Sequence, residues 1–551
     1  MSRSDTDNEK KCEIVAGYEN RHLRVSLFHI LLFYLLYLLC LLCFGWGAWG
    51  LMLLNVSTVG FIVILLALFK VVPGKIRPYV LLVGSVLFVY SEGGAAGLVV
   101  LAVITALTWA VGLAIGRGTS EDNAEDGGAW NGRKILAVVS VAVLALILFG
   151  WKYIPWMMGQ LGGSAAADAS GDVNGVGALA AMPIGLSFYT FQAISYIADL
   201  YMGRLERPER NPFKFALYMM WFPKWMSGPI ERAGAFFEQI QASCEAKRFD
   251  LDRFIRCMSY LIWGMFMKLV IADRLGVVVD SVYADMASCG FLTMMLTSVL
   301  YTIQIYCDFA GYTNSMIGIS GLFGIELTQN FRTPYLAQST TEFWRRWHIS
   351  LSNFLKDYIY IPLGGNRKGE HRKMINTLVV FIVCGLWHGA GLSFLVWGLL
   401  HGFFNICAGL CKKKRLRFAI HGISGQLITF CLVSFAWIFF RANGLGEAFR
   451  FIGGMIPGVN SLSPLAGMVV ADKMMLGIST MEWWIALFSV MLLVVMDVHA
   501  WMRKSVLPEV ITADWGDVAR SVFLVVIAFV VLIFGKYGSG EAIRSFMYMS
   551  F

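Results

Sequence analysis

The sequence predicts an all-α, polytopic integral membrane protein with roughly ten to twelve membrane helices and additional re-entrant helices. Of its 551 residues, 58% are hydrophobic and only 15% are charged, whereas soluble domains carry about 25% charged residues. Apolar runs recur from Leu27 to Phe534. This distribution excludes a soluble enzyme and also excludes a soluble domain with one anchor.

The charged breaks between apolar runs indicate the topology and the segments of the chain. The net charge is +9, and in a membrane protein such an excess marks cytoplasmic loops rather than nucleic-acid binding. No signal-peptide pattern precedes the first apolar run, so the N-terminus is expected to stay in the cytosol. The predicted segments are a polar leader (1–24), N-terminal membrane helices (25–154), an outer flexible loop without Lys or Arg (155–180), a core (181–457) and C-terminal helices and loops (458–551).

Residues 331–374 are dense in charged and aromatic side chains, which favours a helix at the cytoplasmic interface that dips into the protein. Ser339 and Glu342 have the spacing of a capping box, so a helix is predicted to start there. Its apolar face repeats every three or four residues, and His348 lies on that side. The residues of this face are Trp344, Trp347, Leu351, Phe354, Leu355 and Tyr358. The turn-forming residues Pro362, Gly364 and Gly365 are predicted to end it.

The next apolar segment is flanked by basic loops on both sides, at Arg367–Lys373 and at Lys412–Arg417. By the positive-inside rule it enters and leaves the membrane on the same face. It is therefore predicted to be a helical hairpin that turns at Gly389-Ala390-Gly391. His388 follows the last basic residue of the first loop by 15 positions, which is about 22 Å along a helix. This places an imidazole deep in the bilayer.

His388 is the first candidate for chemistry, because an ionisable residue at that depth is costly. Burial should lower its pKa and keep the ring neutral, as a general base requires. The alternative is a packing histidine whose ring binds a backbone carbonyl or a neighbouring side chain. His348 has a similar alternative, an interfacial histidine beside tryptophans. Asp308 either lines a polar channel, orients another group, or caps a helix end near water.

The sequence contains no Walker A loop, no dinucleotide-binding fingerprint, no GxSxG elbow and no zinc-type cluster. Transport driven by ATP and metal-dependent hydrolysis therefore have no support, and neither a metal nor a bound cofactor is expected.

Several long motifs resemble those of the membrane-bound O-acyltransferase (MBOAT) superfamily, in its bacterial alginate O-acetyltransferase-like branch. They include EFWRRWHISLSNFLKDYIYIPLGGNRKG, CGLWHGAGLSFLVWGLLHG, MPIGLSFYTFQAISYIADLY and FPKWMSGPIER. Further motifs are YCDFAGYTNSMIGISGLFGIELTQNFRTPYLA and VSFAWIFFRANGLGEAF, and together they cover roughly residues 60–457. The resemblance implies helices around a central tunnel, with re-entrant helices at its cytoplasmic mouth, and a catalytic core at 181–457.

In such enzymes the histidine of the LWHG motif, here His388, is the catalytic one, and the histidine of the WRRWH motif, here His348, lines the inner approach. The resemblance therefore makes both His388 and His348 catalytic candidates. An acyl group, most simply acetyl from acetyl-CoA as co-substrate, would pass from a cytoplasmic thioester to a hydroxyl on the far side. His388 would accept the hydroxyl proton. Supporting or tunnel-lining candidates are Asp308, Tyr306, Asn314, Asn330 and Trp387. The candidates on the donor side are Arg345, Arg346, Arg367 and Lys368, which a role in topology or at lipid headgroups would equally explain.

The leading functional hypothesis is O-acetylation of an exported polysaccharide such as alginate, by a multi-pass protein of the bacterial inner membrane. The expected partners are membrane lipids, the acyl donor and a periplasmic or membrane-anchored acyltransferase that acts on polysaccharide. Two alternatives keep the fold: D-alanyl transfer to teichoic acid and O-acetylation of peptidoglycan. An alternative of another class is a proton-coupled transporter that uses the buried His388 and Asp308.

Overall fold

A computed structural model describes residues 56–117, 127–161, 182–245, 250–413, 422–457 and 476–537. The chain divides into two compact units, Met1–Ile64 with Tyr537–Ile543 and Leu65–Lys536 with Arg544–Phe551. The described part of the first unit is the beginning of one helix and Tyr537. The polar leader, the run to Leu54 and most of the predicted outer loop lie outside the described residues.

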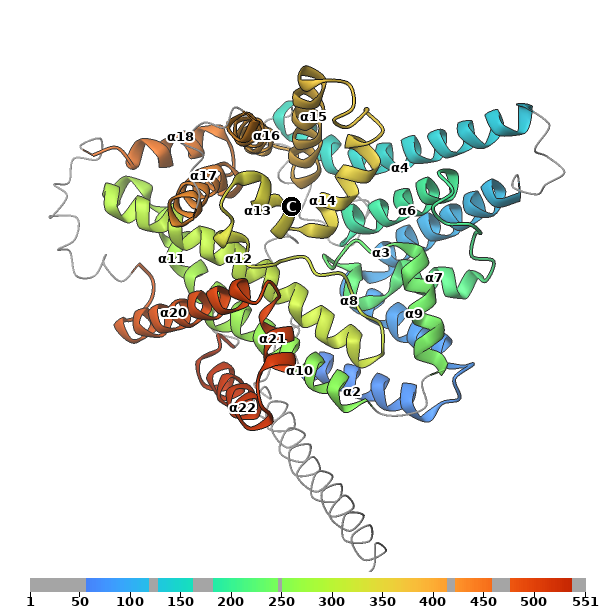
Figure 1. The fold of residues 1–551 in the computed structure, drawn as a ribbon, viewed down its shortest axis with the longest axis horizontal. Coiled ribbons are helices and arrows are strands. Elements are labelled where there is room, and N and C mark those ends of the chain that lie inside the picture. Colours follow the sequence, from blue (N-terminus) through green and yellow to red (C-terminus); the bar gives the residue numbers. More distant parts are fainter. Residues whose placement is uncertain are drawn as a thin grey trace, which may run out of the picture. The chain divides into compact units, whose positions relative to one another are not determined.

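Helices are the regular secondary structure throughout the described ranges, which confirms the predicted all-α class (Figure 1). In the N-terminal half they are α2 (Val56–Val71), α3 (Arg77–Arg117), α4 (Gly127–Leu161), α6 (Leu186–Tyr201), α7 (Pro212–Met220), α8 (Phe222–Trp225), α9 (Ala233–Glu245), α10 (Leu251–Met265), η4 (Phe266–Ala272) and α11 (Asp273–Ala284). The remaining helices are η5 (Met286–Ser288), α12 (Phe291–Leu322), η6 (Pro334–Leu336), α13 (Thr340–Arg346), α14 (Ile349–Leu355), η7 (Lys356–Tyr360), α15 (Glu370–His388), α16 (Leu392–Lys413), α17 (Ile423–Arg441), α18 (Leu445–Gly454), α20 (Thr480–Met502), α21 (Leu507–Asp514) and α22 (Asp517–Phe534).

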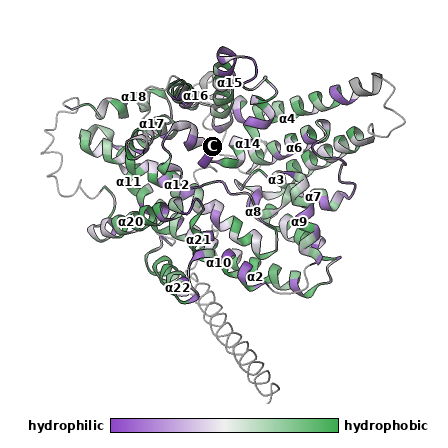
Figure 2. Ribbon diagram, viewed as in Figure 1, coloured by the Kyte–Doolittle hydropathy of each residue, from purple (hydrophilic) through white to green (hydrophobic). Residues whose placement is uncertain are grey.

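Six helices within the described ranges are long and apolar enough to cross a membrane. They lie in α3, α4, α16, α17, α20 and α22. Most residues of these helices are hydrophobic (Figure 2). Some of these side chains point outward, since Leu87 on α3, Leu146 on α4 and Val495 on α20 are each more than half exposed. Apolar side chains exposed in this way along long helices are suited to contact with lipid acyl chains. The predicted polytopic character is confirmed, and the total number of helices stays a prediction.

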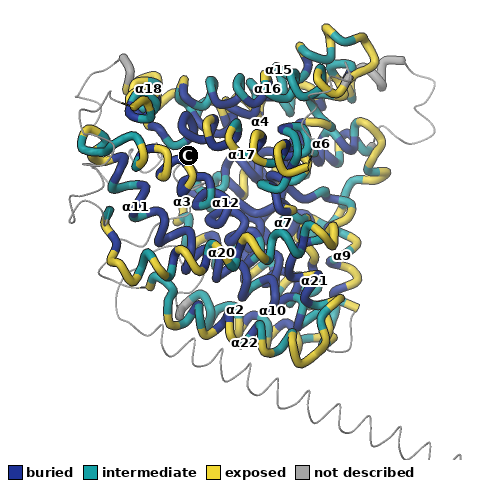
Figure 3. The backbone as a smooth tube through the Cα atoms, turned by 60° about the vertical axis from the view of Figure 1, so that its left-hand side comes forward, coloured by how far each residue is buried: buried dark blue, intermediate teal, exposed yellow. Residues whose placement is uncertain are grey.

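Helices α6 and α12 form much of the buried centre of the second unit (Figure 3). α10 crosses α12 at a pair of glycines: a Cβ on Gly264 would lie 2.6 Å from the carbonyl oxygen of Gly311. Without side chains at the crossing the two backbones come close, as is common between membrane helices. α12 is continuous, so Asp308 lies in mid-helix. The alternative that Asp308 caps a helix end is wrong.

The predicted interfacial helix is broken into three pieces, α13, α14 and η7. Ser339 does cap the start, because its hydroxyl accepts the backbone N–H of Glu342 at 3.2 Å. The Glu342 carboxylate, however, binds the backbone N–H of Gln338 at 2.9 Å, so the box is shifted by one residue. α13 ends before Trp347, and His348 adopts a left-handed conformation with φ 43° and ψ 56°. A single continuous helix here was the wrong expectation.

The predicted hairpin is confirmed as α15 and α16, which pack against each other and are joined by Gly389, Ala390 and Gly391. α4 differs from expectation at its end, because it continues through Pro155 to Leu161 and into the range predicted as loop. Apolar, exposed side chains at Trp156, Met157 and Met158 allow this last part to remain helical in a lipid-facing position.

Candidate active site

The hairpin places His388 at the last position of α15, just before the turn. Its two arms cross closely at Gly385 and Gly398. A Cβ on Gly385 would collide with the carbonyl oxygen of Phe394, and a Cβ on Gly398 would collide with that of Phe381. The small residues therefore set the distance between the arms. This contact fixes the helix end from which the His388 ring projects.

A second helix holds the end of α15 from outside the hairpin. Lys152 and Tyr153, on α4, bind the carbonyl groups that the last turn of α15 leaves without helical partners. The ammonium group of Lys152 donates to the carbonyl oxygen of Trp387 at 2.5 Å. The Tyr153 hydroxyl donates to Leu386 at 2.7 Å and lies 3.3 Å from the carbonyl oxygen of Gly389. A cation at a helix C-terminus also interacts favourably with the helix dipole.

His348 lies in the bend between α13 and α14, and Asn330 holds this bend in place. The backbone carbonyl of Asn330 accepts from the N–H of Ile349 at 3.0 Å, and its side-chain oxygen accepts from the N–H of Ser350 at 3.1 Å. The first N–H groups of a helix have no hydrogen-bond acceptor within the helix, and these two bonds supply acceptors for the first two N–H groups of α14. They offset the cost of a left-handed conformation at a residue with a side chain.

The bend and the hairpin bring His348 and His388 together. Their ring centroids are 6.5 Å apart, and Trp387 contacts both, at 6.0 Å from His348 and 4.8 Å from His388. Further aromatic rings surround the pair, with Phe309 4.9 Å from His348 and Phe440 5.3 Å from His388. Both histidines are buried. Two imidazoles thus lie beside each other, with their ring planes inclined by 63°, and aromatic rings surround them.

The protonation of His348 follows from this enclosure. His348 lies outside the six candidate spans, and its side chain is completely buried. Burial lowers the pKa of His348 to about 3, because the charged ring loses its hydration. The ring is therefore neutral at pH 7 and has both a hydrogen-bond donor and an acceptor.

Asp308 pairs with a lysine. The ammonium group of Lys268, on η4, lies 2.5 Å from the Asp308 carboxylate and 2.8 Å from that of Asp273. All three side chains are buried. The residue next in sequence, Phe309, is the one that packs on the His348 ring. The ion pair with Lys268 ties Asp308 to the packing of α12 against η4.

Three of the supporting candidates, Tyr306, Asn314 and Asn330, carry side-chain hydrogen-bond donors of the kind that stabilise an oxyanion, and they occupy different positions. The Tyr306 hydroxyl lies 3.4 Å from the carboxylate of Asp497 on α20, and the Asn314 amide lies 3.7 Å from the sulfur of Met267. Asn330 is bonded to the residues that follow His348, as described above. Its Nδ2 group is buried and donates no hydrogen bond within the described structure. Of the three, Asn330 alone carries a buried amide donor beside the histidine bend.

The four basic candidates for the donor side differ in their surroundings. Arg346 is engaged within its own helix, 2.7 Å from the Glu342 carboxylate, and also donates to the Thr333 hydroxyl at 3.1 Å. Arg345, Arg367 and Lys368 are exposed. Arg346 therefore stabilises α13, and the other three are accessible to a soluble ligand.

Two site residues were missed in the sequence. His401, on α16, is fully buried, and its Nδ1 atom accepts a hydrogen bond from Trp344 at 3.2 Å. Trp397 contacts both His401 and His388, at ring distances of 4.9 and 5.0 Å. Lys152 was the other omission. Both His401 and Lys152 lie inside helices that are candidate spans, so an ionisable residue within an apolar run was the available signal.

Comparison with known proteins shows the family. Residues 204–446 match the family model described as MBOAT, membrane-bound O-acyltransferase family. The chain is 32% identical to the probable alginate O-acetylase AlgI of Azotobacter vinelandii, over 73% of this chain and 77% of that protein. The chain belongs to the MBOAT family, in its alginate O-acetylase-like branch. The matched range contains His348, His388 and His401, whereas Lys152 precedes it.

Other MBOAT relatives match over a shorter range. A probable alginate O-acetylase of Pseudomonas fluorescens is 39% identical over 52% of this chain and 56% of its own length. A peptidoglycan O-acetyltransferase of Helicobacter pylori is 36% identical over 51% of this chain and 58% of its own length. The chain therefore spans little more than half of these two proteins. With the six candidate spans, the family identifies a multi-pass bacterial membrane protein.

Proposed function

We propose that this protein transfers an acetyl group from a cytoplasmic thioester, acetyl-CoA, to a hydroxyl for O-acetylation of an exported polysaccharide such as alginate. The observation that carries the proposal is the buried pair of His348 and His388, whose ring centroids are 6.5 Å apart. His388 lies at the tip of the hairpin, and His348 lies in the bend between α13 and α14. The names of the MBOAT relatives support acyl transfer as the reaction and a polysaccharide as the acceptor.

In the proposed reaction His388 acts as the general base. Its neutral ring accepts the proton of the acceptor hydroxyl while the oxygen attacks the thioester carbonyl. The tetrahedral intermediate then collapses, the carbon–sulfur bond breaks, and the imidazolium returns the proton to the thiolate. The products are an ester and a free thiol, so charge and protons balance.

His348 and Asn330 are proposed to stabilise and orient the reacting groups. The oxyanion that forms on the thioester carbonyl requires hydrogen-bond donors in a dry site. A neutral His348 ring carries one N–H donor, and the buried Nδ2 group of Asn330 lies on the residue that holds the His348 bend. Arg345, Arg367 and Lys368 are exposed cations suited to the phosphates of the donor. The proposed central tunnel would join these two regions.

O-acetylation of peptidoglycan is a second candidate, favoured by the H. pylori relative. The histidine pair would catalyse the same reaction with either acceptor, so the acceptor has to be found by experiment.

We also propose that this protein lies in the inner membrane and works with a periplasmic or membrane-anchored acyltransferase. This partner would complete the transfer of the acetyl group to the polymer.

The test compares His388→Ala with His371→Ala in purified protein reconstituted in nanodiscs. His371 is exposed at the start of the same helix, so it is a matched control. Release of free thiol from radiolabelled acetyl-CoA is measured with alginate oligomers as acceptor. Loss of a general base lowers the rate by about 10²–10⁴-fold. His371→Ala should retain the wild-type rate.

Several outcomes would contradict the proposal. An undiminished rate in His388→Ala would reject the histidine mechanism. Labelled peptidoglycan fragments in place of alginate would select the second candidate, and turnover only with a D-alanyl thioester would replace acetyl transfer. If wild type consumes no thioester but carries a solute across proteoliposomes, the protein is a transporter.

A further inference from the structure

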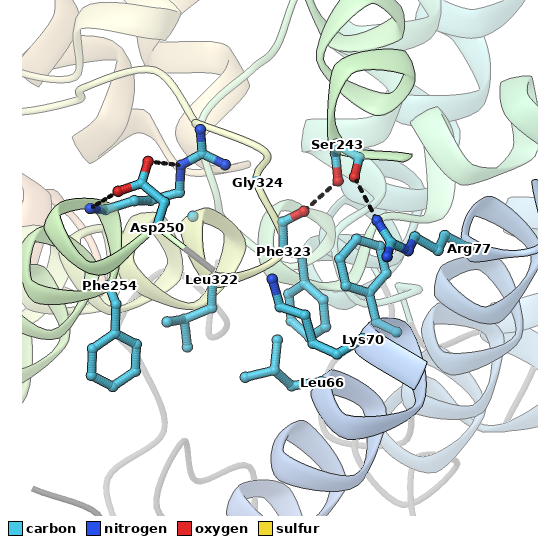
Figure 4. A pocket seen from close by; sticks show the side chains of 12 residues that line it. Leu66, Lys70, Arg77, Ser243, Asp250, Phe254, Leu322, Phe323 and Gly324 are labelled. Carbon is cyan, nitrogen blue, oxygen red and sulfur yellow. Dashed lines mark hydrogen bonds and ion pairs between the residues drawn. The ribbon is translucent and has the colours of Figure 1, made fainter. Parts of the chain in front are cut away.

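The chain that leaves α12 runs antiparallel to α9. Near the C-terminal end of α9 the Ser243 hydroxyl donates to the carbonyl oxygen of Phe323 at 2.5 Å (Figure 4). One turn earlier on α9, the side-chain oxygen of Gln239 accepts the backbone N–H of Glu326 at 2.5 Å. Residues 325–330 form no helix, so their backbone groups need partners of this kind. α9 therefore fixes the first part of this connection.

Glu231, which lies just before α9, continues this series of contacts. Its side chain is buried. Its Oε1 atom accepts the backbone N–H of Thr328 at 2.5 Å, and its Oε2 atom accepts the Thr328 hydroxyl at 3.0 Å. Both oxygens of the carboxylate thus bind one residue, through its backbone and through its side chain. Because hydrogen bonds to a charged acceptor are stronger than those between neutral groups, this pair holds Thr328 in one position.

The connection leads from Thr328 to the bend that carries His348. Asn330, two residues after Thr328, binds the backbone that follows His348. The loop between α8 and α9 also reaches this backbone directly, since the N–H of Ile230 donates to the Ser350 hydroxyl at 3.1 Å. One short loop therefore holds the histidine bend by two routes, one direct and one through the connection.

We propose that Glu231 is a positioning residue for acyl transfer. Its carboxylate fixes Thr328 and with it Asn330. Asn330 in turn holds the bend that carries His348. This inference rests on the function proposed above, in which His348 takes part in the reaction. Glu231 acts through the connection and not on the reacting groups.

The test compares two replacements of Glu231 that remove the same charge. Glu231→Gln keeps an acceptor for the N–H of Thr328, and its amide can donate to the Thr328 hydroxyl oxygen. Glu231→Met keeps the length of the side chain but makes neither bond. The carboxylate also attracts the ammonium group of Lys224, and both variants lose this attraction equally. The difference between the two variants therefore reflects the hydrogen bonds to Thr328.

A milder variant and a matched control complete the set. Thr328→Val removes only the hydroxyl bond and lies at an exposed position, so it decides the matter if Glu231→Met does not fold. Glu326→Met is the control on the same connection. The Glu326 carboxylate is 61% exposed and lies 2.7 Å from Arg256, and exposed ion pairs of this kind contribute little to stability.

Two readouts are measured on the full chain in nanodiscs. Hydrogen–deuterium exchange of the peptide that contains Ile349 and Ser350 reports on the bend without any reaction. Thiol release from labelled acetyl-CoA gives kcat and KM. Glu231→Met should exchange about tenfold faster or more in this peptide, because the acceptors of these N–H groups move. Its kcat should fall by about 10–100-fold, with KM for acetyl-CoA changed by less than about twofold. Glu231→Gln should stay within about threefold of wild type in both readouts, Thr328→Val should lie between the two, and Glu326→Met should match wild type.

Unchanged exchange in Glu231→Met and Thr328→Val would overturn the role of Glu231, whatever the rates. Faster exchange with an unchanged kcat, while His388→Ala is inactive, would overturn it as well, because the bend would then not affect the reaction. An equal loss in Glu231→Gln and Glu231→Met would assign the effect to the charge and not to the bonds with Thr328. If His388→Ala keeps the wild-type rate, the proposed function fails instead, and exchange alone decides whether Glu231 holds the bend.

Discussion

The ammonium group of Lys152, on α4, donates a hydrogen bond of 2.5 Å to the carbonyl oxygen of Trp387, on α15. The acceptor belongs to the residue that directly precedes His388. A lysine of α4 therefore stabilises the C-terminal end of α15, where the proposed general base His388 lies. Because Lys152 contacts the backbone and not the reacting atoms, we regard it as a positioning residue.

Lys152→Met should lower the stability of the hairpin end and the rate of acyl transfer. Loss of a charged hydrogen bond to a backbone carbonyl costs about 1.5–3 kcal/mol. Lys152→Arg should recover part of both, since it keeps the cation at the helix terminus. The measurements are thermal unfolding and the turnover of labelled thioester. Lys134→Met, an exposed position on the same helix, is the control and should leave both unchanged.

The left-handed backbone at His348 predicts which of two substitutions at this position destabilises the protein more. His348→Val should be less stable than His348→Asn by about 1–2 kcal/mol, because a β-branched residue tolerates this conformation poorly and asparagine tolerates it well. Both variants lack the imidazole, so the difference between their free energies of unfolding reflects the cost of the left-handed backbone conformation. Equilibrium unfolding in mixed micelles provides the measurement. At His371, a helical position, the same two substitutions should differ by only about a few tenths of a kcal/mol. If the two substitutions differed as much at His371 as at His348, the backbone at His348 would not be strained.

The hydrogen bond from Trp344 to His401 predicts the result of removing its donor. Trp344→Phe leaves the Nδ1 atom of His401 buried without a partner, which costs about 1–3 kcal/mol beyond the loss of ring volume. Trp397→Phe is the control, because the buried Nε1 atom of Trp397 donates no hydrogen bond within the described ranges. Unfolding temperatures of the two variants are compared. If both lose the same stability, the hydrogen bond to His401 contributes nothing.

The glycine contact between the hairpin arms predicts opposite effects at two positions of α16. Gly398→Ala places a methyl group against the backbone of α15 and should destabilise by about 1–3 kcal/mol or more. Gly409→Ala meets nothing within 4 Å and should stabilise by about 0.5–1 kcal/mol, because alanine loses less entropy in a helix. The two variants are compared by equilibrium unfolding. A similar change in stability at both positions, whether a gain or a loss, would show that the contact between the arms does not determine the effect at Gly398.

The structural elements that were predicted correctly are those whose determinants lie close together in the sequence. Basic flanks and the Gly-Ala-Gly turn predicted the hairpin, and Ser339 predicted the start of α13. The break at His348 escaped prediction because its cause lies 18 residues upstream, where Asn330 bonds to the backbone after the histidine. Apolar periodicity continues across the bend and gives no sign of it.

The ion-pair partner of Asp308 likewise could not be predicted from the sequence pattern. Lys268 precedes it by 40 residues and lies on a π-helix, and no spacing rule joins the two. Their ion pair exists because α12 packs against η4, which is a tertiary contact. The family resemblance singled out His348 and His388 as site residues, but their proximity, with ring centroids 6.5 Å apart, was not predicted, because it arises from tertiary packing.

The glycine crossing of α15 and α16 has a mechanical consequence. At Gly385 and Gly398 the backbones of the two helices touch without an intervening side chain that could be compressed. We therefore expect the two arms to move together, with His388 at their tip. A change in the space around this histidine would then come from displacement of α4, α13 or α17, which contact the hairpin.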